Sequence, residues 1–429
     1  MPFLNVRARA VLALLPLLAA AACKDTTPTL SGDEFFPGGG RPVTLEAIIP
    51  ASQFLQTIGS FAGFESGHTF PEQLVANQYQ GVLNAHALDR FGFPDSLVFS
   101  QDGSSKTDTL FGVRSARLVL TIDTLGSALA GSTTIQAFEL AQRYDALTAT
   151  WDSAFNTDST RVLWTQPGGT VGALLGQGTY THAAGDSVVI ALDSATAARI
   201  RPDSFPGVLL AVNSGKRLQI ASTVLRLAAR PSNAVRDTTI TVNVNASEQA
   251  FVFTPQPPTP AGSWLAGGVT AARTLFSVDL DQPLPGCAGP TACATVRLKD
   301  VQLNRVSLLL KPLPSPAGFD PLRPVTLTLW TVDEPELGRR APLQQLAIDA
   351  DLAQNSFVNQ LVADTVVELP ITLLARQRAQ LDSLQLSFAL LGQTPPVSGA
   401  SFRSFGLSRF DALPRLRIVY TLPTRPQLP

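Results

Sequence analysis

Short apolar runs separated by turn-forming residues dominate the chain after residue 42. A period-two alternation of apolar and polar positions occupies residues 325–330 (Val-Thr-Leu-Thr-Leu-Trp), as expected of a strand with one buried face. Similar short runs occupy residues 116–122, 187–192, 208–212 and 224–227. Such spacing predicts an all-β fold of antiparallel, jelly-roll-like β-sandwiches and not a β-α-β array.

Helical patterns are few. The best helical segment is 373–384, and the pattern of 71–88 is weaker. The 33 prolines and 31 glycines agree with this reading, because long helices tolerate neither residue.

The apolar runs recur in the same order in both halves of the chain. The pairs are Arg117-Leu-Val-Leu with Arg305-Val-Ser-Leu, Thr134-Ile-Gln-Ala-Phe with Val325-Thr-Leu-Thr-Leu, Asp186-Ser-Val-Val with Asp364-Thr-Val-Val, Leu225-Arg-Leu with Leu416-Arg-Ile, and Ala51-Ser52 with Ala246-Ser247. Their offsets are 188, 191, 178, 191 and 195 residues. Nearly constant offsets predict two tandem sandwich domains, residues 43–232 and 233–422, before a tail of residues 423–429. One large two-sheet domain with internal pseudo-symmetry is the alternative.

Residues 1–22 have the pattern of an export signal. Arg7 and Arg9 precede an apolar run from Ala10 to Ala22, which is short for a membrane span of about 20 residues and typical of a signal peptide. The residues before Cys23 resemble the lipobox of bacterial lipoproteins, although Ala20 stands where leucine is usual. The resemblance implies a lipid on Cys23. A plain secretory signal is the alternative.

The segment of residues 23–42 is polar and rich in Pro and Gly. It cannot bury enough apolar surface to order itself, which predicts a flexible tether.

Charged residues form only 15% of the chain, and the net charge is −1. An average soluble domain has about 25% charged residues. The low value suits an extracellular β-protein, and the lack of a basic stripe argues against nucleic acid as a partner.

Two cysteines remain after Cys23. Cys287 and Cys293 flank the turn-forming segment Ala-Gly-Pro-Thr-Ala. We predict a disulfide between them, which requires an oxidising compartment. A metal site is the alternative, although no histidine lies nearby in the sequence.

Four segments carry a family resemblance. They are Val113-Arg-Ser-Ala-Arg-Leu-Val-Leu, Leu147-Thr-Ala-Thr-Trp151, Phe205-Pro-Gly207-Val-Leu-Leu and Pro414-Arg-Leu-Arg-Ile-Val-Tyr420. They resemble strand motifs of DNRLRE-type β-sandwich domains, over about residues 80–422. The second half lacks the Thr-Trp element, and the name-giving string is absent. The resemblance implies a β-sandwich on a secreted or surface protein and carries no catalytic role.

No motif for known chemistry is present. His68, His86 and His182 are far apart and lie in Gly- or Ala-rich segments. The sequence has no Gly-x-Ser-x-Gly elbow, His-Glu-x-x-His motif or Walker loop. These observations predict that the protein is not an enzyme, while a triad assembled by the fold would be the exception.

Acidic residues could bind a structural Ca²⁺, as in other exported β-proteins. The groups are Asp279 with Asp281, and Asp95 with Asp102 and Asp108. Calcium takes six to eight oxygens, and neither group supplies them alone. We therefore expect no cofactor and leave a structural Ca²⁺ open.

The four tryptophans divide into two classes. Trp151 and Trp330 lie in strand-like contexts and are expected in the core. Trp164 and Trp264 lie beside glycines in predicted loops. We expect Trp164 and Trp264 to be exposed, and they are the candidate ligand-binding residues.

These features predict a lipid-anchored protein of the cell envelope, at the outer membrane on its periplasmic or surface face. Its role would be structural, adhesive or in assembly, with the membrane and an unknown envelope protein or polysaccharide as partners. A polysaccharide-binding surface module is the alternative, and a hydrolase accessory is a third reading.

Overall fold

The computed structural model describes residues 42–64, 68, 70, 72–93, 95–129, 131–199, 205–213, 215–234, 237–258, 260–288, 293–323, 325–349, 357–358, 365–381, 384–393 and 405–422. The predicted signal peptide, Cys23, the tether up to residue 41 and the tail of residues 423–429 lie outside the described residues. Within the described ranges, no helix has the length and apolar character needed to cross a bilayer.

The fold is all-β with antiparallel sheets, as the apolar pattern predicts. Residues 72–253 contain β3 (Gln73–Tyr79), β4 (Leu83–Phe91), β5 (Leu97–Gln101), β6 (Ser104–Asp108), β7 (Gly112–Asp123), β8 (Thr133–Leu140), β9 (Ser153–Asn156), β10 (Arg161–Leu163), β11 (Val171–Tyr180), β12 (Ser187–Leu192), β13 (Val208–Val212), β14 (Lys216–Arg230) and β15 (Ile240–Phe253). The helices there are η2 (His182–Ala184) and α4 (Ser194–Arg199). We name this part of the chain the inner repeat.

Residues 44–61 and 263–422 form the outer repeat. Its strands are β1 (Thr44–Pro50), β2 (Leu55–Phe61), β16 (Ser263–Gly267), β17 (Arg273–Asp279), β18 (Leu284–Pro285), β19 (Thr295–Val296), β20 (Gln302–Leu310), β21 (Pro312–Leu313), β22 (Val325–Val332), β23 (Leu343–Leu346), β24 (Phe357–Val358), β25 (Val367–Pro370), β26 (Gln385–Gln393), β27 (Leu407–Asp411) and β28 (Arg415–Thr421). Its helices are α3 (Ala51–Phe54), η3 (Leu298–Asp300), η4 (Pro335–Arg340) and α5 (Thr372–Gln380).

The main sheet of the inner repeat is curled and has nine strands, and the hairpins β5-β6 and β9-β10 form two further small sheets. The path runs β11-β8-β13-β4-β15-β14-β7-β12, and β3 pairs with β14 and β4. The end strands of the path meet, because a Cβ on Gly178 of β11 would lie 2.9 Å from the carbonyl oxygen of Val189 in β12. Glycine permits this approach. The curl encloses an apolar core that includes Leu118, Ile135 and Ile190.

The main body of the outer repeat is a sandwich of two sheets, and the repeat also contains the small sheets β16-β27-β21 and β18-β19. One sheet has the order β1-β28-β20-β25, and the other has the order β2-β17-β26-β22-β23. Their alternating strands place Leu416, Ile418 and Tyr420 of β28 in one core with Leu327 and Leu329 of β22. The period-two pattern of the sequence therefore reports the buried face correctly.

The two repeats share one strand order. The path β12-β7-β14-β15 of the inner repeat corresponds to β25-β20-β28-β1, and β15-β4-β13-β8-β11 corresponds to β2-β17-β26-β22-β23. The long strand β15 serves both halves of its sheet, whereas α3 separates β1 from β2 in the outer repeat. The described residues of the five sequence pairs fall on or next to corresponding strands, or on the joint between them, which explains their common order.

The strands β1 and β15, which begin the two predicted domains, pair outside the predicted domain boundaries. β1 pairs with β28, with Ile49 opposite Leu416, and β15 pairs with β14, with Val244 opposite Leu225. The predicted border between residues 232 and 233 lies in the connection between β14, which ends at Arg230, and β15, which begins at Ile240, and these two strands pair with each other. The inner repeat is an insertion between β2 and β16, and the chain crosses between the repeats twice.

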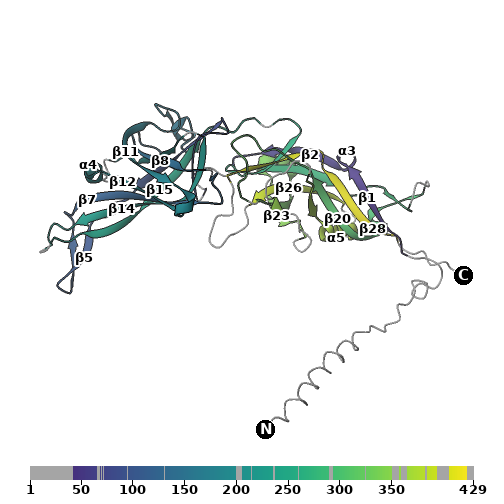
Figure 1. Cartoon of the computed structure of the whole chain (residues 1–429). Helices are drawn as coiled ribbons and strands as arrows, with labels where there is room; N and C mark the ends of the chain where they lie inside the picture. Colours follow the sequence, from purple (N-terminus) through teal and green to yellow (C-terminus); the bar gives the residue numbers. More distant parts are fainter. Residues whose placement is uncertain are drawn as a thin grey trace, which may run out of the picture.

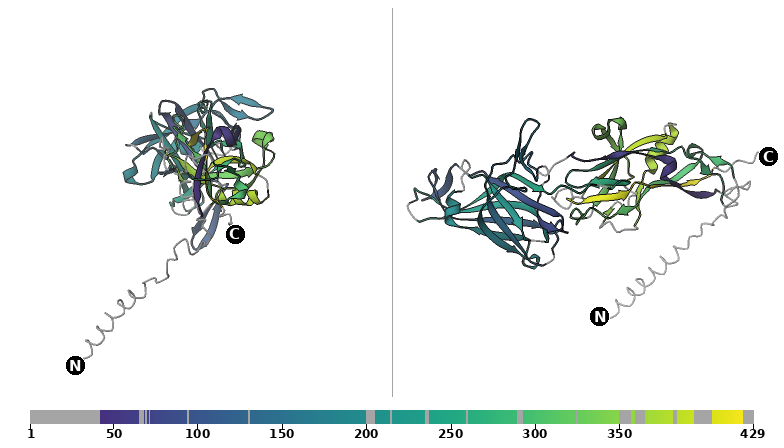
Figure 2. Two further views of the ribbon diagram at one scale, coloured as in Figure 1. Left: turned by 90° about the vertical axis from the view of Figure 1, so that its right-hand side faces the viewer. Right: turned by 90° about the horizontal axis from the view of Figure 1, so that it is seen from above.

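The two repeats lie end to end, as two views of the molecule show (Figure 1 and Figure 2). The β1 and β28 strands are at one end, where Thr44 lies opposite Thr421. The hairpin of β5 and β6 projects from the opposite end (Figure 1). The molecule is therefore elongated, with its first and last described strands together.

Candidate functional site

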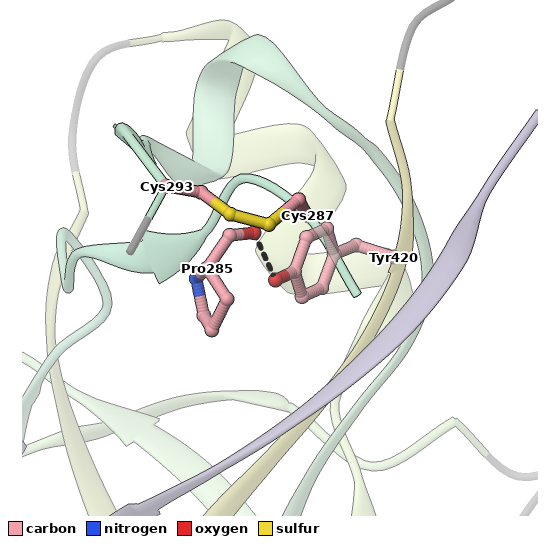
Figure 3. The surroundings of a disulfide bond; sticks show 4 residues. All are labelled: Pro285, Cys287, Cys293 and Tyr420. Carbon is pink, nitrogen blue, oxygen red and sulfur yellow. Dashed lines mark hydrogen bonds between the residues drawn. A yellow bond between two sulfur atoms is a disulfide. The ribbon is translucent and has the colours of Figure 1, made fainter. Parts of the chain in front are cut away.

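The predicted disulfide between Cys287 and Cys293 is present. It closes the loop between β18 and β19, with the two Cα atoms 6.0 Å apart. Beside it, the Tyr420 hydroxyl donates a hydrogen bond of 2.6 Å to the Pro285 carbonyl oxygen, and Figure 3 shows this ring under the loop. The Tyr420 hydrogen bond thus ties β18 to the last strand of the outer repeat, beside the disulfide.

Replacing both Cys287 and Cys293 with serine should lower the free energy of unfolding by about 2 kcal/mol, because the short closed loop restricts the unfolded chain. Urea unfolding of both proteins, with and without reductant, measures the difference. Reductant should produce the same loss in the wild-type protein and none in the variant. A wild-type protein that is insensitive to reductant would contradict this prediction.

The expected exposure of Trp164 and Trp264 is wrong, since only 5% and 1% of these residues is exposed. The Trp164 indole N–H donates to the Thr150 carbonyl oxygen at 2.9 Å. Trp264 stacks on Phe276 with ring centroids 4.4 Å apart. Trp264 belongs to β16, which pairs with β27. The glycines near Trp264 therefore lie at the ends of a strand and not in a long loop. Neither indole can present a flat exposed face to a sugar.

In the described part of the chain, His86 and His182 have hydrogen-bond partners other than carboxylates. A ring nitrogen of His86 lies 2.7 Å from the Gly168 carbonyl oxygen, and its ring packs on Trp151 at 5.3 Å. Burial lowers the pKa of His86, which favours the neutral ring. His182 lies 3.4 Å from the Tyr180 hydroxyl. These two side chains have structural surroundings.

In both acidic groups considered for calcium, at least one carboxylate has protein partners. Asp279 accepts a hydrogen bond from the Asp281 backbone N–H at 2.9 Å, and Asp281 forms an ion pair with Arg297 at 3.1 Å. Asp108 accepts hydrogen bonds from Leu110 and Ser232. In the part of the chain that the structure describes, no group of three or more His, Cys, Asp or Glu residues could hold a metal ion.

The junction between the repeats contains buried ion pairs. Arg323 of the outer repeat contacts Glu72 at 3.0 Å and also contacts Asp123, and both carboxylates belong to the inner repeat. Gln219 donates a further hydrogen bond to Glu72. Burial raises the pKa of Glu72, although Arg323 and Gln219 act in the opposite direction. The three ionic side chains are each at most 11% exposed.

A second buried cation joins the repeats nearby. Arg217 of β14 is 1% exposed and donates to the Asp320 carbonyl oxygen at 2.9 Å. Its guanidinium lies 4.8 Å from the ring centre of Phe405, a cation–π contact. Gln80 accepts a hydrogen bond from the Gly318 N–H at 2.7 Å. Residues 318–323 of the outer repeat are therefore held by hydrogen bonds and ion pairs on the inner repeat.

An aromatic cluster occupies the same junction. Phe251 and Phe253 end β15, and Phe319 and Phe405 come from loops of the outer repeat. The Phe319 and Phe405 rings stack with centroids 5.4 Å apart, and Phe253 meets Phe405 at 5.6 Å. A cavity of about 330 Å³ opens beside these rings. This cavity is the candidate site that the structure provides.

This site has no motif in the sequence, because phenylalanine has no polar group and is typical of core packing. One local signal was available. Phe251 and Phe253 end a strand directly before Pro255 and Pro257, so the strand stops where its aromatic residues meet a second layer. Pairing with Phe319 and Phe405 depends on the fold and has no sequence signal.

Comparisons with known proteins do not identify the chain. No protein-family model matches it, and no curated protein matches it. The resemblance to DNRLRE-type domains therefore remains a prediction.

Among solved structures, the chain is similar to a protein from Parabacteroides distasonis that is described as a putative secreted protein, with 10% identity, 87% of this chain and 99% of that chain covered, and a TM-score of 0.22. It is also similar to the infectious bursal disease virus VP2 subviral particle, with 11% identity, 90% and 73% coverage, and a TM-score of 0.13. These scores are too low to define a shared fold.

Proposed function

We propose that the protein is an exported, lipid-anchored and non-catalytic component of the cell envelope that displays its inner repeat at a distance from the membrane. The observation that carries this proposal is the junction between the repeats, which buried ionic side chains hold together. Two chain crossings and the buried contacts of Arg217 and Arg323 resist bending between them. A display protein needs such stiffness, because a hinge would let the distal part fold back.

The position of the first strand supports a membrane-distal inner repeat. A lipid on Cys23 would attach through residues 24–42 to Thr44, at the free end of the outer repeat (Figure 1). The β5–β6 hairpin is at the other end of the molecule. The inner repeat would then face partners of the envelope, and the outer repeat would act as the stalk.

The disulfide supports export. Bonds such as Cys287–Cys293 persist in oxidising compartments and are rare in the cytosol. The polysaccharide-binding alternative loses its basis, because it depended on exposed Trp164 and Trp264. We therefore propose a structural, adhesive or assembly role and not polysaccharide binding.

Changing Cys23 to Ser should release the protein from the membrane, because the acyl chains supply the anchor. Metabolic labelling with palmitate and fractionation of cells measure this. The wild-type protein should carry label and sediment with membranes, and the Cys23→Ser protein should do neither. The control is the double variant Cys287→Ser/Cys293→Ser, which should keep both label and membrane association. An unlabelled wild-type protein found in the soluble fraction would refute the anchor.

A further inference from the structure

The cavity at the junction is built by both repeats. One part of its wall is residues 149–152 of the inner repeat, and another is the turn of residues 268–270 of the outer repeat. Phe251, Phe253 and Phe405 also line it. Its volume of about 330 Å³ falls within the range of roughly 300–1,000 Å³ for small-molecule sites, which occur preferentially at domain interfaces.

The floor of the cavity is apolar. Phe251, Phe319 and Phe405 are almost fully buried, and Phe253 is half-buried. Val269 and Leu407 add aliphatic surface. Water in contact with such a surface is released favourably when an apolar group replaces it. The floor therefore favours an apolar body over a sugar or an ion.

The rim of the cavity is polar, and its charge is negative. Asp152, Gln256 and Thr270 line it, and Asp152 is the charged residue among the described lining residues. A carboxylate accepts hydrogen bonds and attracts cations. A head group that donates, such as a hydroxyl or an ammonium, therefore suits this rim, and a carboxylate or phosphate does not.

The inner wall is preformed. The Trp164 indole donates to the Thr150 carbonyl oxygen, and the Trp164 backbone N–H donates to the Asp152 carbonyl oxygen at 3.1 Å. The Gly168 N–H donates to the Trp151 carbonyl oxygen at 2.6 Å. Each residue from 150 to 152 is thus held by a backbone hydrogen bond. A wall fixed before binding reduces the entropy lost when a ligand is bound.

We propose that this cavity binds a small amphiphile with an apolar body and a hydroxyl or ammonium head group. The apolar body packs on Phe251, Phe253 and Phe405, and the head group donates to Asp152. The site goes beyond the display role and does not depend on the lipid anchor.

The binding test uses the full-length exported chain with Cys23→Ser, so that no protein-bound lipid competes, and the neutral fluorophore N-phenyl-1-naphthylamine as the probe. We expect saturable binding with enhanced fluorescence. Thr270→Trp places an indole at the rim of the cavity and should weaken binding at least about tenfold. Thr241→Trp adds the same indole to an exposed position at the other end of β15 and should leave binding unchanged.

The head group is tested by displacing the probe with decylamine, decanol or decanoate, each below its aggregation concentration. Decylamine should displace the probe at about fivefold lower concentration than decanoate, as expected for a partly exposed charge pair. Asp152→Asn should remove this difference, and Asp158→Asn, in the same segment but outside the cavity, should keep it. Circular dichroism of each variant verifies folding.

Two results would overturn the proposal. Equal probe binding by Thr270→Trp and Thr241→Trp would remove the cavity as the site. Equal displacement by decylamine and decanoate in the wild-type protein would remove the role of Asp152. Neither result would bear on membrane anchoring, which the palmitate labelling measures separately.

Discussion

Replacing Arg323 with Met should lower the free energy of unfolding by about 3–5 kcal/mol, the loss typical of a broken buried ion pair. Arg323 contacts both Glu72 and Asp123, and these side chains are 8% and 11% exposed. The variant leaves two carboxylates buried together without their cation. Urea unfolding at pH 8 measures the loss.

A surface ion pair provides the matched control. Arg114 and Asp237 are 43% and 60% exposed, and Arg114→Met should cost less than about 1 kcal/mol. If Arg323→Met lowers the free energy of unfolding as little as Arg114→Met, the junction is hydrated. The buried ion pairs would then not hold the two repeats rigidly together.

The loss in Arg323→Met should also depend on pH. Burial already raises the pKa of Glu72 in the presence of Arg323, and removal of the cation should raise it further. Acid then protonates Glu72 in the folded variant and removes its repulsion of Asp123. The difference from the wild-type protein should therefore shrink as the pH falls from 8 to 5. Adding Glu72→Gln to Arg323→Met should restore part of the stability at pH 8.

The sequence predicts the strands well where one face is buried. In β28, Leu416, Ile418 and Tyr420 are fully buried and the residues between them are not. In such strands the apolar residues recur at every second position, and this spacing shows which face is buried. The repeat is visible for the same reason, because corresponding strands need the same buried positions.

The sequence does not reveal which of the two repeats β1 joins and which β15 joins. Ile49 and Val244 occupy corresponding positions, opposite Leu416 and Leu225. Both strands present an apolar residue to an apolar partner, so local pattern allows either pairing. The choice of partner depends on the contacts of the whole fold, and β1 pairs with β28 while β15 pairs with β14.

Helix prediction gives one success and one error. The predicted helix at 373–384 corresponds to α5, Thr372–Gln380. The weaker one at 71–88 forms β3 and β4 instead. Its two halves are separated by a turn in which Gly81 has a φ of +78°. Central positions in the inner sheet outweigh the weak helical pattern, since tertiary contacts override propensity.

The Asp89→Asn variant should be more stable than the wild-type protein above pH 7. Asp89 is fully buried in β4. Its Oδ1 accepts a hydrogen bond of 2.9 Å from the Gln73 amide, and in the described part of the structure its Oδ2 has no hydrogen-bond partner. Burial raises the pKa of Asp89 from 3.8 to about 7, because the charged form loses its hydration.

The sign of the pH dependence follows from proton binding. Between pH 3.8 and about 7, the folded state binds a proton on Asp89 that the unfolded state has released. Stability therefore falls as the pH rises through this window and stays constant above it. The size is on the order of 4 kcal/mol, since each pKa unit corresponds to 1.36 kcal/mol.

Urea unfolding of the wild-type protein and of Asp89→Asn at pH 4, 5, 6, 7 and 8 isolates this contribution, because all other groups titrate alike in both. Asn keeps an acceptor for Gln73 and has no charge to bury, so the difference between the two stabilities should change in favour of Asn across the window. Asp158→Asn, on an exposed turn, should follow the wild-type curve throughout. Parallel curves for the wild-type protein and Asp89→Asn would mean that Asp89 is ionised and solvated in the folded protein. The curled sheet would then admit water at β4 and could not enclose the dry core that its apolar strands predict.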